Sequence, residues 1–257
     1  MISIWRRPND TNLNYMTSSI HITGQNTEQF SIQVLETETA KIQALNLITQ
    51  ELLGDYPVIS AFGFDKTSEA ALQYWIEMHL SQNIAFGCYT SEGDLVAVDC
   101  LYVRNIRDTF LNWSENSGKA FRSFIKYIKI IETRVRYLSK RKVCNYLTSV
   151  GVFTTPAHRD IGIQKQMIRM RKLIAKSLGI EVVGSVFIGS NMIDAAKANK
   201  YKDLDTFNTP QDMKKLDLDF NFGKVFPIKI MGVRYNNLPE KLVVDEEESG
   251  NTVTLID

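Results

Sequence analysis

The segment that most constrains the fold lies at the centre of the chain, where two apolar runs flank a turn and a helical pattern. Val143–Thr154 is predicted as a strand, Gln164–Leu178 as a helix and Glu181–Phe187 as a second strand. Gly179 suits the end of this helix, because glycine adopts the left-handed conformation there without strain. Strand, helix and strand at this spacing form a βαβ unit, so the sequence predicts an α/β fold with a parallel or mixed sheet.

Shorter patterns on both sides of this unit predict further elements. Alternating apolar and polar residues indicate strands, and apolar residues three or four positions apart indicate helices. The other predicted strands are Ile2–Arg6, Phe30–Leu35, Ile84–Tyr89, Leu95–Val103 and Lys229–Tyr235. The other predicted helices are 39–53, 68–80, 119–139 and 191–200. We expect one domain over residues 1–238 and an acidic, mobile tail over 239–257, because the tail carries a run of four acidic residues.

Composition narrows the classes of function. Lys and Arg total 30 against 29 Asp and Glu, which argues against a nucleic-acid binder. No apolar stretch approaches the ~20 residues of a membrane span, and the start lacks the apolar region of a signal peptide. We therefore expect a cytoplasmic protein that binds neither membrane nor nucleic acid. The three cysteines, Cys88, Cys100 and Cys144, lie in apolar runs and are predicted to be reduced core thiols, with no metal site.

The turn between the central strand and helix is the candidate binding site. A helix start presents backbone N–H groups without helical partners, its dipole attracts anions, and Gly162 permits close approach to a ligand. The turn consists of Arg159, Asp160, Ile161, Gly162, Ile163 and Gln164. The basic residues predicted to surround it are Arg159, Lys165, Arg169, Arg171 and Lys172. A diphosphate site and an ordinary strand-to-helix connection both fit, whereas the three glycines of a dinucleotide fingerprint and the Gly-Lys-Ser/Thr of a P-loop are absent.

The same turn resembles motif A of the GNAT superfamily of N-acetyltransferases, Arg/Gln-x-x-Gly-x-Gly/Ala. Arg159 and Gly162 fill the first two fixed positions, and Gln164 stands where Gly or Ala is usual. Residues 151–203 resemble the insect-type arylalkylamine N-acetyltransferases, and Asp55-Tyr56-Pro57-Val58 resembles the Asp-Glu-Pro-Leu motif of that group. The resemblance covers about residues 1–235.

This resemblance implies the acyl-CoA N-acyltransferase fold, a twisted, mostly antiparallel sheet of about seven strands that is flanked by helices and split where coenzyme A enters. It implies acetyl-CoA as co-substrate, bound by the turn at 159–164. The end of the central strand, Val152, Phe153 and Thr154, would hold the thioester. A small primary amine would attack the acetyl group directly, without a metal; we expect the enzyme to be a monomer.

The residues of the proton path depart from the pattern of the resembling family. Tyr56 stands where the family has its general base, a Glu; Asp55 is adjacent, and Ser190 lies among positions where the family uses serines. A phenol with a pKa near ~10 is a weak base at neutral pH. Two interpretations stay open: an active enzyme with a different proton path, in which Tyr56, Ser190 or His158 takes part, and a coenzyme A-binding protein without turnover. Acetylation of a protein terminus or lysine is a third.

Two further features have competing interpretations. The basic helix at 119–142 fits a solvated face better than a nucleic-acid surface, because few aromatics lie among its charges. Phe62, Phe64, Tyr74 and Trp75 are candidates for the wall of an arylalkylamine pocket, or for the hydrophobic core.

Overall fold

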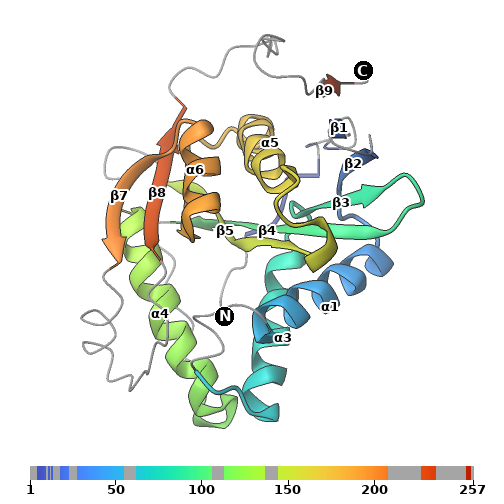
Figure 1. The fold of residues 1–257 in the computed structure, drawn as a ribbon. Helices are drawn as coiled ribbons and strands as arrows, with labels where there is room; N and C mark the ends of the chain where they lie inside the picture. Colours follow the sequence, from blue (N-terminus) through green and yellow to red (C-terminus); the bar gives the residue numbers. More distant parts are fainter. Residues whose placement is uncertain are drawn as a thin grey trace.

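One sheet forms the centre of the molecule, and helices cover both of its faces (Figure 1). The computed structural model describes residues 5–9, 11, 13, 18–22, 28–54, 62–105, 113–136, 144–207, 227–235 and 253–255. The strands are β1 (Ser18–Ile22), β2 (Glu28–Val34), β3 (Phe86–Thr90), β4 (Leu95–Asn105), β5 (Asn145–Thr154), β6 (Val182–Ile188), β7 (Lys202–Phe207), β8 (Ile228–Arg234) and β9 (Val253–Leu255). The α-helices are α1 (Glu38–Gly54), α3 (Lys66–Leu80), α4 (Lys119–Arg136), α5 (Ile163–Ser177) and α6 (Ser190–Ala198).

The sheet is mixed and mostly antiparallel, as predicted. Its strands lie in the order β7-β8-β6-β5-β4-β3-β2-β1-β9. Every neighbouring pair is antiparallel except β5 and β6, which are parallel and are joined by α5. The central βαβ unit is therefore confirmed, and it supplies the one parallel pair of the described sheet.

The strand count differs from the prediction of about seven. The sheet has nine strands in the described part of the chain, because β1, β7 and β9 were not predicted. Strand β7 carries three charged residues among its six and lies at an edge, where charge discourages further pairing and weakens the apolar signal. The predicted strand Ile2–Arg6 is wrong at Trp5 and Arg6, which belong to no strand; residues 2–4 lie outside the described residues.

The C-terminal tail contributes to the sheet. Three of its residues form β9, which pairs antiparallel with β1. That stretch of the tail therefore lies beside β1, whereas the domain boundary at 238 and the mobility of the tail stay predictions.

Two hydrophobic cores lie on the two faces of the sheet. On one face α1, α3 and α4 pack through residues such as Ile48, Leu72 and Phe121. On the other face α5 and α6 pack through residues such as Met167 and Ile193. Figure 1 shows the same division, with α5 and α6 above the sheet and the other three helices below it.

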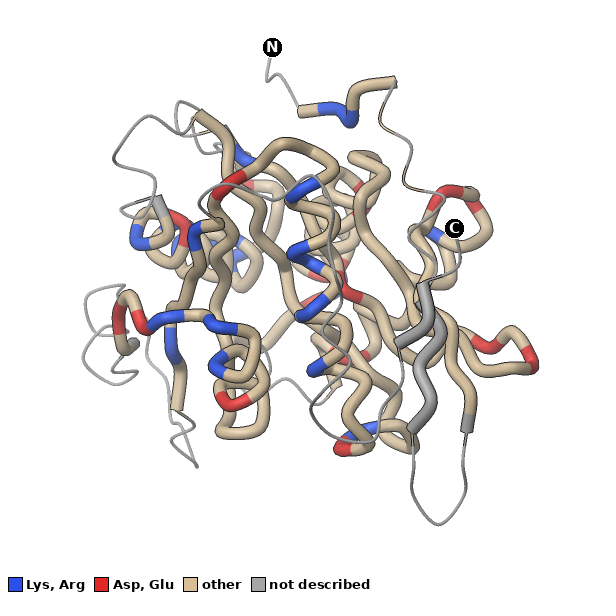
Figure 2. Tube along the Cα trace, turned by 90° about the horizontal axis from the view of Figure 1, so that it is seen from above, with Lys and Arg blue, Asp and Glu red and all other residues tan. Residues whose placement is uncertain are grey.

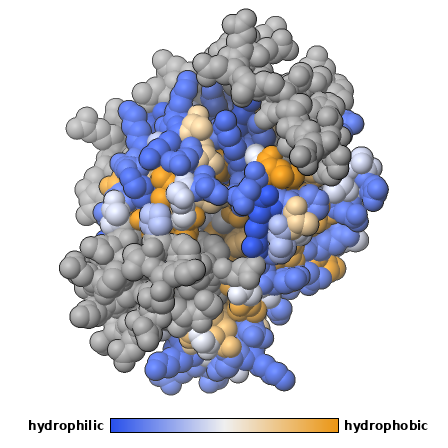
Figure 3. Space-filling model, viewed as in Figure 1, coloured by the Kyte–Doolittle hydropathy of each residue, from blue (hydrophilic) through white to orange (hydrophobic). Residues whose placement is uncertain are grey.

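The described surface carries no broad apolar area on the face shown in Figure 3, where small hydrophobic areas are scattered among hydrophilic ones. Within the described ranges, no helix has the length and apolar character to cross a membrane. The same residues contain no group of three or more His, Cys, Asp or Glu placed to hold a metal ion.

The cysteines correct one expectation. Cys88 and Cys100 are free and buried, whereas Cys144 is free and exposed, so only two of the three are core thiols. Burial raises the pKa of Cys88 to about 12 and raises the pKa of Cys100 further, which keeps both thiols protonated at neutral pH.

Candidate functional site

The site begins where the sheet divides between β5 and β6. The parallel ladder between them is recorded for one pair, Leu147 with Val183. Past this pair both strands continue, β5 as far as Thr154 and β6 as far as Ile188. Backbone groups beyond the ladder are thus available for other partners, since a strand edge offers unpaired N–H and C=O groups.

A bulge in β5 accompanies the division. Asp99 of β4 lies opposite Val152, but Leu101 lies opposite Ser149, so β5 has one more residue than β4 over this stretch. A bulge bends its strand and changes the faces to which side chains point. It therefore sets the direction of the last residues of β5.

A cavity of about 420 Å³ lies at this division. Its lining residues come from the ends of β5 and β6, from the starts of α5 and α6 and from α1, so both helical layers reach it. They are Glu51, Val152, Phe153, Thr154, Arg159, Asp160, Gln164, Ile188, Gly189, Ser190, Asn191, Met192 and Pro227. The cavity thus gathers most of the residues that the sequence proposed as one site. A larger hollow of about 860 Å³ between α1, β2 and β3 contains none of them.

The turn before α5 is open to a ligand. Gly162 is the N-cap of α5 with φ 96° and ψ −4°, a left-handed conformation that favours glycine, and no side chain caps the helix there. A Cβ atom at Gly162 would meet no atom within 4 Å, so the space beside it is free. The first N–H groups of α5 lack helical acceptors by geometry, which makes this end suited to an anion.

Apart from Gly162, the residues of the turn divide into two groups. Arg159, Asp160 and Gln164 line the cavity, and Asp160 accepts a hydrogen bond of 2.8 Å from Asn191 at the start of α6. Ile161 and Ile163 instead pack their side chains into the core beneath α5. These two can serve a ligand through backbone N–H groups alone.

The charges around the turn differ from the expectation in two places. Lys and Arg recur along α5 (Figure 2), and Lys165 and Arg169 are exposed. Arg171, however, is 1% exposed and pairs with Asp99 inside the protein, so it does not surround the turn. Arg159 donates to the carbonyl of Thr154 at 3.2 Å and to the Glu51 carboxylate at 2.5 Å, so its charge is already compensated.

Of the three catalytic candidates, the structure places one. Ser190 is exposed, begins α6 and lines the cavity. Asp55 and Tyr56 lie outside the described residues, so their roles remain predictions. His158 contacts Thr155 through its Nδ1 at 2.8 Å and packs its ring edge-on against Phe30, which fits a residue of the turn.

Two groups of the cavity bear on chemistry in ways that the sequence did not predict: the side-chain hydroxyl of Thr154 and the carboxylate of Glu51. The hydroxyl of Thr154, whose residue is 2% exposed, has no hydrogen-bond partner although it is buried. Such a group is costly unless a ligand or water completes it. Glu51 supplies the carboxylate on the α1 side; nothing in the helical pattern of α1 distinguishes it from other polar residues.

The aromatic candidates belong mainly to the core. Trp75 is 4% exposed, and Phe62 and Phe64 pack against Phe124 at ring distances of 6.2 and 6.3 Å. Tyr74 is 60% exposed and contacts Trp113. None of the four lines the cavity at the strand division.

No protein-family model and no curated protein sequence matches the chain. Solved structures do. A putative arylalkylamine N-acetyltransferase 7 of the mosquito Aedes aegypti superposes with a TM-score of 0.79 at 17% identity, over 90% of this chain and 99% of that chain. The chain has the GNAT fold. Arylalkylamine N-acetyltransferase 2 of the same mosquito superposes with a TM-score of 0.69 at 14% identity, over 80% of this chain and 99% of that chain. A polyamine N-acetyltransferase of Drosophila melanogaster superposes with a TM-score of 0.63 at 12% identity, over 79% of this chain and 99% of that chain.

The GNAT fold confirms the structural part of the resemblance, including its likeness to the insect N-acetyltransferases. The predicted positions also agree with it: the motif-like turn begins α5, and the split of the sheet lies beside that turn. At 17% identity or less, the likeness extends to architecture and not to substrate.

Proposed function

We propose that the chain is an N-acetyltransferase that transfers the acetyl group of acetyl-CoA to a small primary amine. One observation carries the proposal: the open start of α5 and the free end of β5 line the same cavity, at the division of the sheet. One supplies an anion site and the other supplies unpaired backbone groups beside it. An acyl-CoA needs both, because its diphosphate and its thioester arm are far apart.

The residues divide the chemistry as follows. The N–H groups at Gly162 to Gln164 would bind the diphosphate, and Val152 to Thr154 would hold the thioester arm. The neutral amine nitrogen attacks the thioester carbonyl and the C–S bond breaks. The proton that the nitrogen loses as the amide forms is transferred to the leaving sulfur, which departs as the thiol of coenzyme A. The proximity of the two substrates accounts for much of the rate in such a direct transfer.

An ammonium has no lone pair, so the amine must first lose a separate proton before it can attack. The candidates for this transfer are Ser190, which lines the cavity, Tyr56 and Asp55. The acceptor is a small primary amine; an arylalkylamine stays a possibility from sequence, because the described aromatic candidates pack on one another and away from the cavity.

A coenzyme A-binding protein without turnover is the second candidate. It is favoured by Tyr56, which replaces the carboxylate of the resembling family. In that case the cavity would bind the coenzyme and the amine would find no base.

The test is a thiol-release assay with acetyl-CoA against a panel of small amines, with wild-type protein beside Tyr56→Glu. We expect wild type to release coenzyme A with at least one amine. Activity only in Tyr56→Glu would establish the second candidate, and activity in neither, although acetyl-CoA binds, would also contradict turnover.

A further inference from the structure

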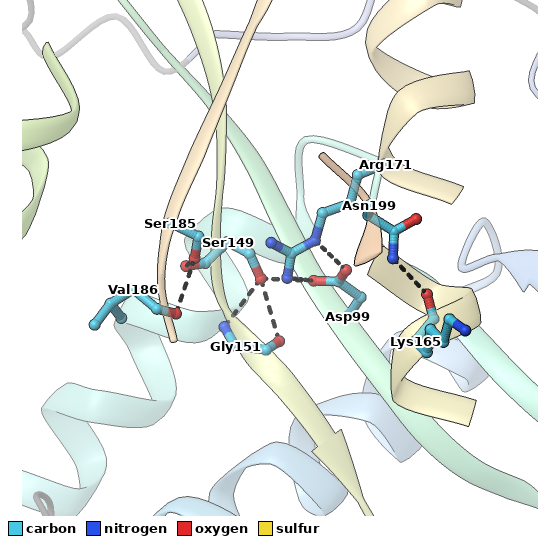
Figure 4. Close-up of polar contacts among 8 residues, drawn as sticks. All are labelled: Asp99, Ser149, Gly151, Lys165, Arg171, Ser185, Val186 and Asn199. Carbon is cyan, nitrogen blue, oxygen red and sulfur yellow. Dashed lines mark hydrogen bonds and ion pairs between the residues drawn. The ribbon is translucent and has the colours of Figure 1, made fainter. Parts of the chain in front are cut away.

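A buried hydrogen-bond network lies beneath the cavity and contacts the strand that would hold the thioester. Ser149 of β5 is its centre (Figure 4). The hydroxyl of Ser149 donates to Asp99 Oδ1 at 2.6 Å and accepts the N–H of Gly151 at 3.0 Å. The second bond closes across the bulge, so a side chain holds the backbone where β5 changes direction.

Asp99 links this bulge to α5. Arg171 donates from Nε to Asp99 Oδ2 at 2.6 Å and from Nη2 to Asp99 Oδ1 at 3.1 Å. Both side chains are at most 1% exposed. A buried ion pair adds little stability over an apolar pair of the same size, because desolvation of the charges opposes their attraction. What the pair does supply is a fixed distance and orientation between α5 and β4.

Ser149 also bridges the division of the sheet. Its carbonyl accepts a hydrogen bond of 3.3 Å from the hydroxyl of Ser185 in β6. The ladder between these strands has its recorded pair two residues earlier on each strand, Leu147 with Val183. A side chain therefore takes over from the backbone at the point where the strands separate.

We infer that Ser149 is a positioning residue for the acyl-CoA arm: it fixes the end of β5 relative to α5, which carries the diphosphate turn. The inference rests on the proposed function. Ser149 does not line the cavity, so it acts through the backbone of Val152 to Thr154. Ser149 is held relative to α5 by its hydrogen bond to Asp99, which pairs with Arg171 of that helix.

Two ligands separate this role from a general loss of structure. Acetyl-CoA spans the turn and β5, whereas 3′-phospho-ADP is the half of coenzyme A that lacks the pantetheine arm. Ser149→Ala removes the contacts of the hydroxyl with the Asp99 carboxylate and with the backbone of Gly151. We expect it to weaken acetyl-CoA binding by about tenfold and 3′-phospho-ADP binding by less than about twofold, as measured by calorimetry.

Matched variants make the result specific. Ser149→Thr keeps the hydroxyl and should restore the wild-type ratio of the two affinities. Thr148→Val removes a buried hydroxyl from the preceding residue of β5, whose side chain points to the other face, and should leave the ratio unchanged. Thermal unfolding checks that each variant is folded. If Ser149→Ala does not fold, Ser149→Cys keeps nearly the same volume with weaker hydrogen bonds, and should shift the ratio in the same direction.

An equal loss of both ligands, or no loss of either, would overturn the inference. If wild type binds 3′-phospho-ADP and acetyl-CoA but Ser149→Ala keeps their ratio, the positioning role fails and the proposed function stands. If wild type binds neither ligand, the proposed function fails, and the inference fails with it.

Discussion

His79 is a buried side chain through which the stability of the protein should depend on pH. Its ring stacks on Tyr102 at 3.9 Å and meets the edge of Trp75 at 4.5 Å. Both ring nitrogens are buried and have no hydrogen-bond partner. Burial, with a smaller effect from Arg104, lowers the pKa of His79 to about 3. The folded protein therefore holds a neutral histidine in its core at all moderate pH values.

The stability of the protein should fall in acid partly because of this residue. Below pH 6.5 the unfolded chain protonates His79, while the folded protein leaves it neutral until about pH 3, so acid favours the unfolded state over this window. His79→Phe keeps the aromatic contacts and removes the proton. Between pH 8 and pH 5, the free energy of unfolding of wild type should fall by about 2 kcal/mol more than that of His79→Phe.

Urea unfolding of both proteins at a series of pH values measures this difference. The carboxylates are the same in the two proteins, so their contribution cancels. Parallel curves between pH 8 and pH 5 would show that His79 is not kept neutral by the fold.

At the scale of elements, an ion pair between α1 and the turn before α5 lies beside the proposed anion site. Glu51 is 10% exposed, lines the cavity and lies 2.5 Å from Arg159. A diphosphate at the start of α5 would meet this carboxylate as a like charge, and Arg159 would have to serve both. The helix thus places an internal anion beside the site for an external one.

Glu51→Gln should raise the affinity for coenzyme A several-fold, because it removes a negative charge and releases Arg159. The gain should shrink as salt is added, since salt screens charge at a partly open site. Glu38→Gln, at the other end of α1, is the matched control and should have no effect. Lower affinity in Glu51→Gln would mean that Glu51 orients Arg159 for the phosphate.

The sequence predicted elements well where periodicity is strong and contacts are local. The β5–α5–β6 unit was predicted because its apolar pattern changes from strand to helix and back. The short strand β7 was missed because its charged residues resemble a loop. The bulge in β5 has no sequence signal of its own, because it arises from the register with β4.

Long-range pairs were beyond prediction for a related reason. Arg171 lies 72 residues from Asp99, and the basic pattern of α5 suggested an exposed residue. Glu51 lies 108 residues from Arg159 and is one polar residue among many on α1. Two parts of the cavity, the turn and the end of β5, could be predicted from a local motif. The ion-pair partners could be identified only once the fold was known.

At the scale of the whole molecule, the two helical layers and the divided sheet form a single site. α5 and α6 approach the cavity from one face and α1 from the other, and the ends of β5 and β6 lie between them. In the proposed function, this arrangement would let a coenzyme on one side meet an acceptor on the other. We propose that the free N–H groups at the start of α5 bind the diphosphate of that coenzyme.

Calorimetric titration of coenzyme A into wild-type protein and into Gly162→Asp tests this proposal. The substitution adds a negative charge and bulk beside the N–H groups, and Gly162→Ala is the control for the change in backbone conformation alone. We expect saturable binding to wild type, a smaller loss in Gly162→Ala, and at least about a tenfold loss in Gly162→Asp. Equal affinity of Gly162→Asp and wild type, or no binding to wild type at millimolar coenzyme A, would contradict it.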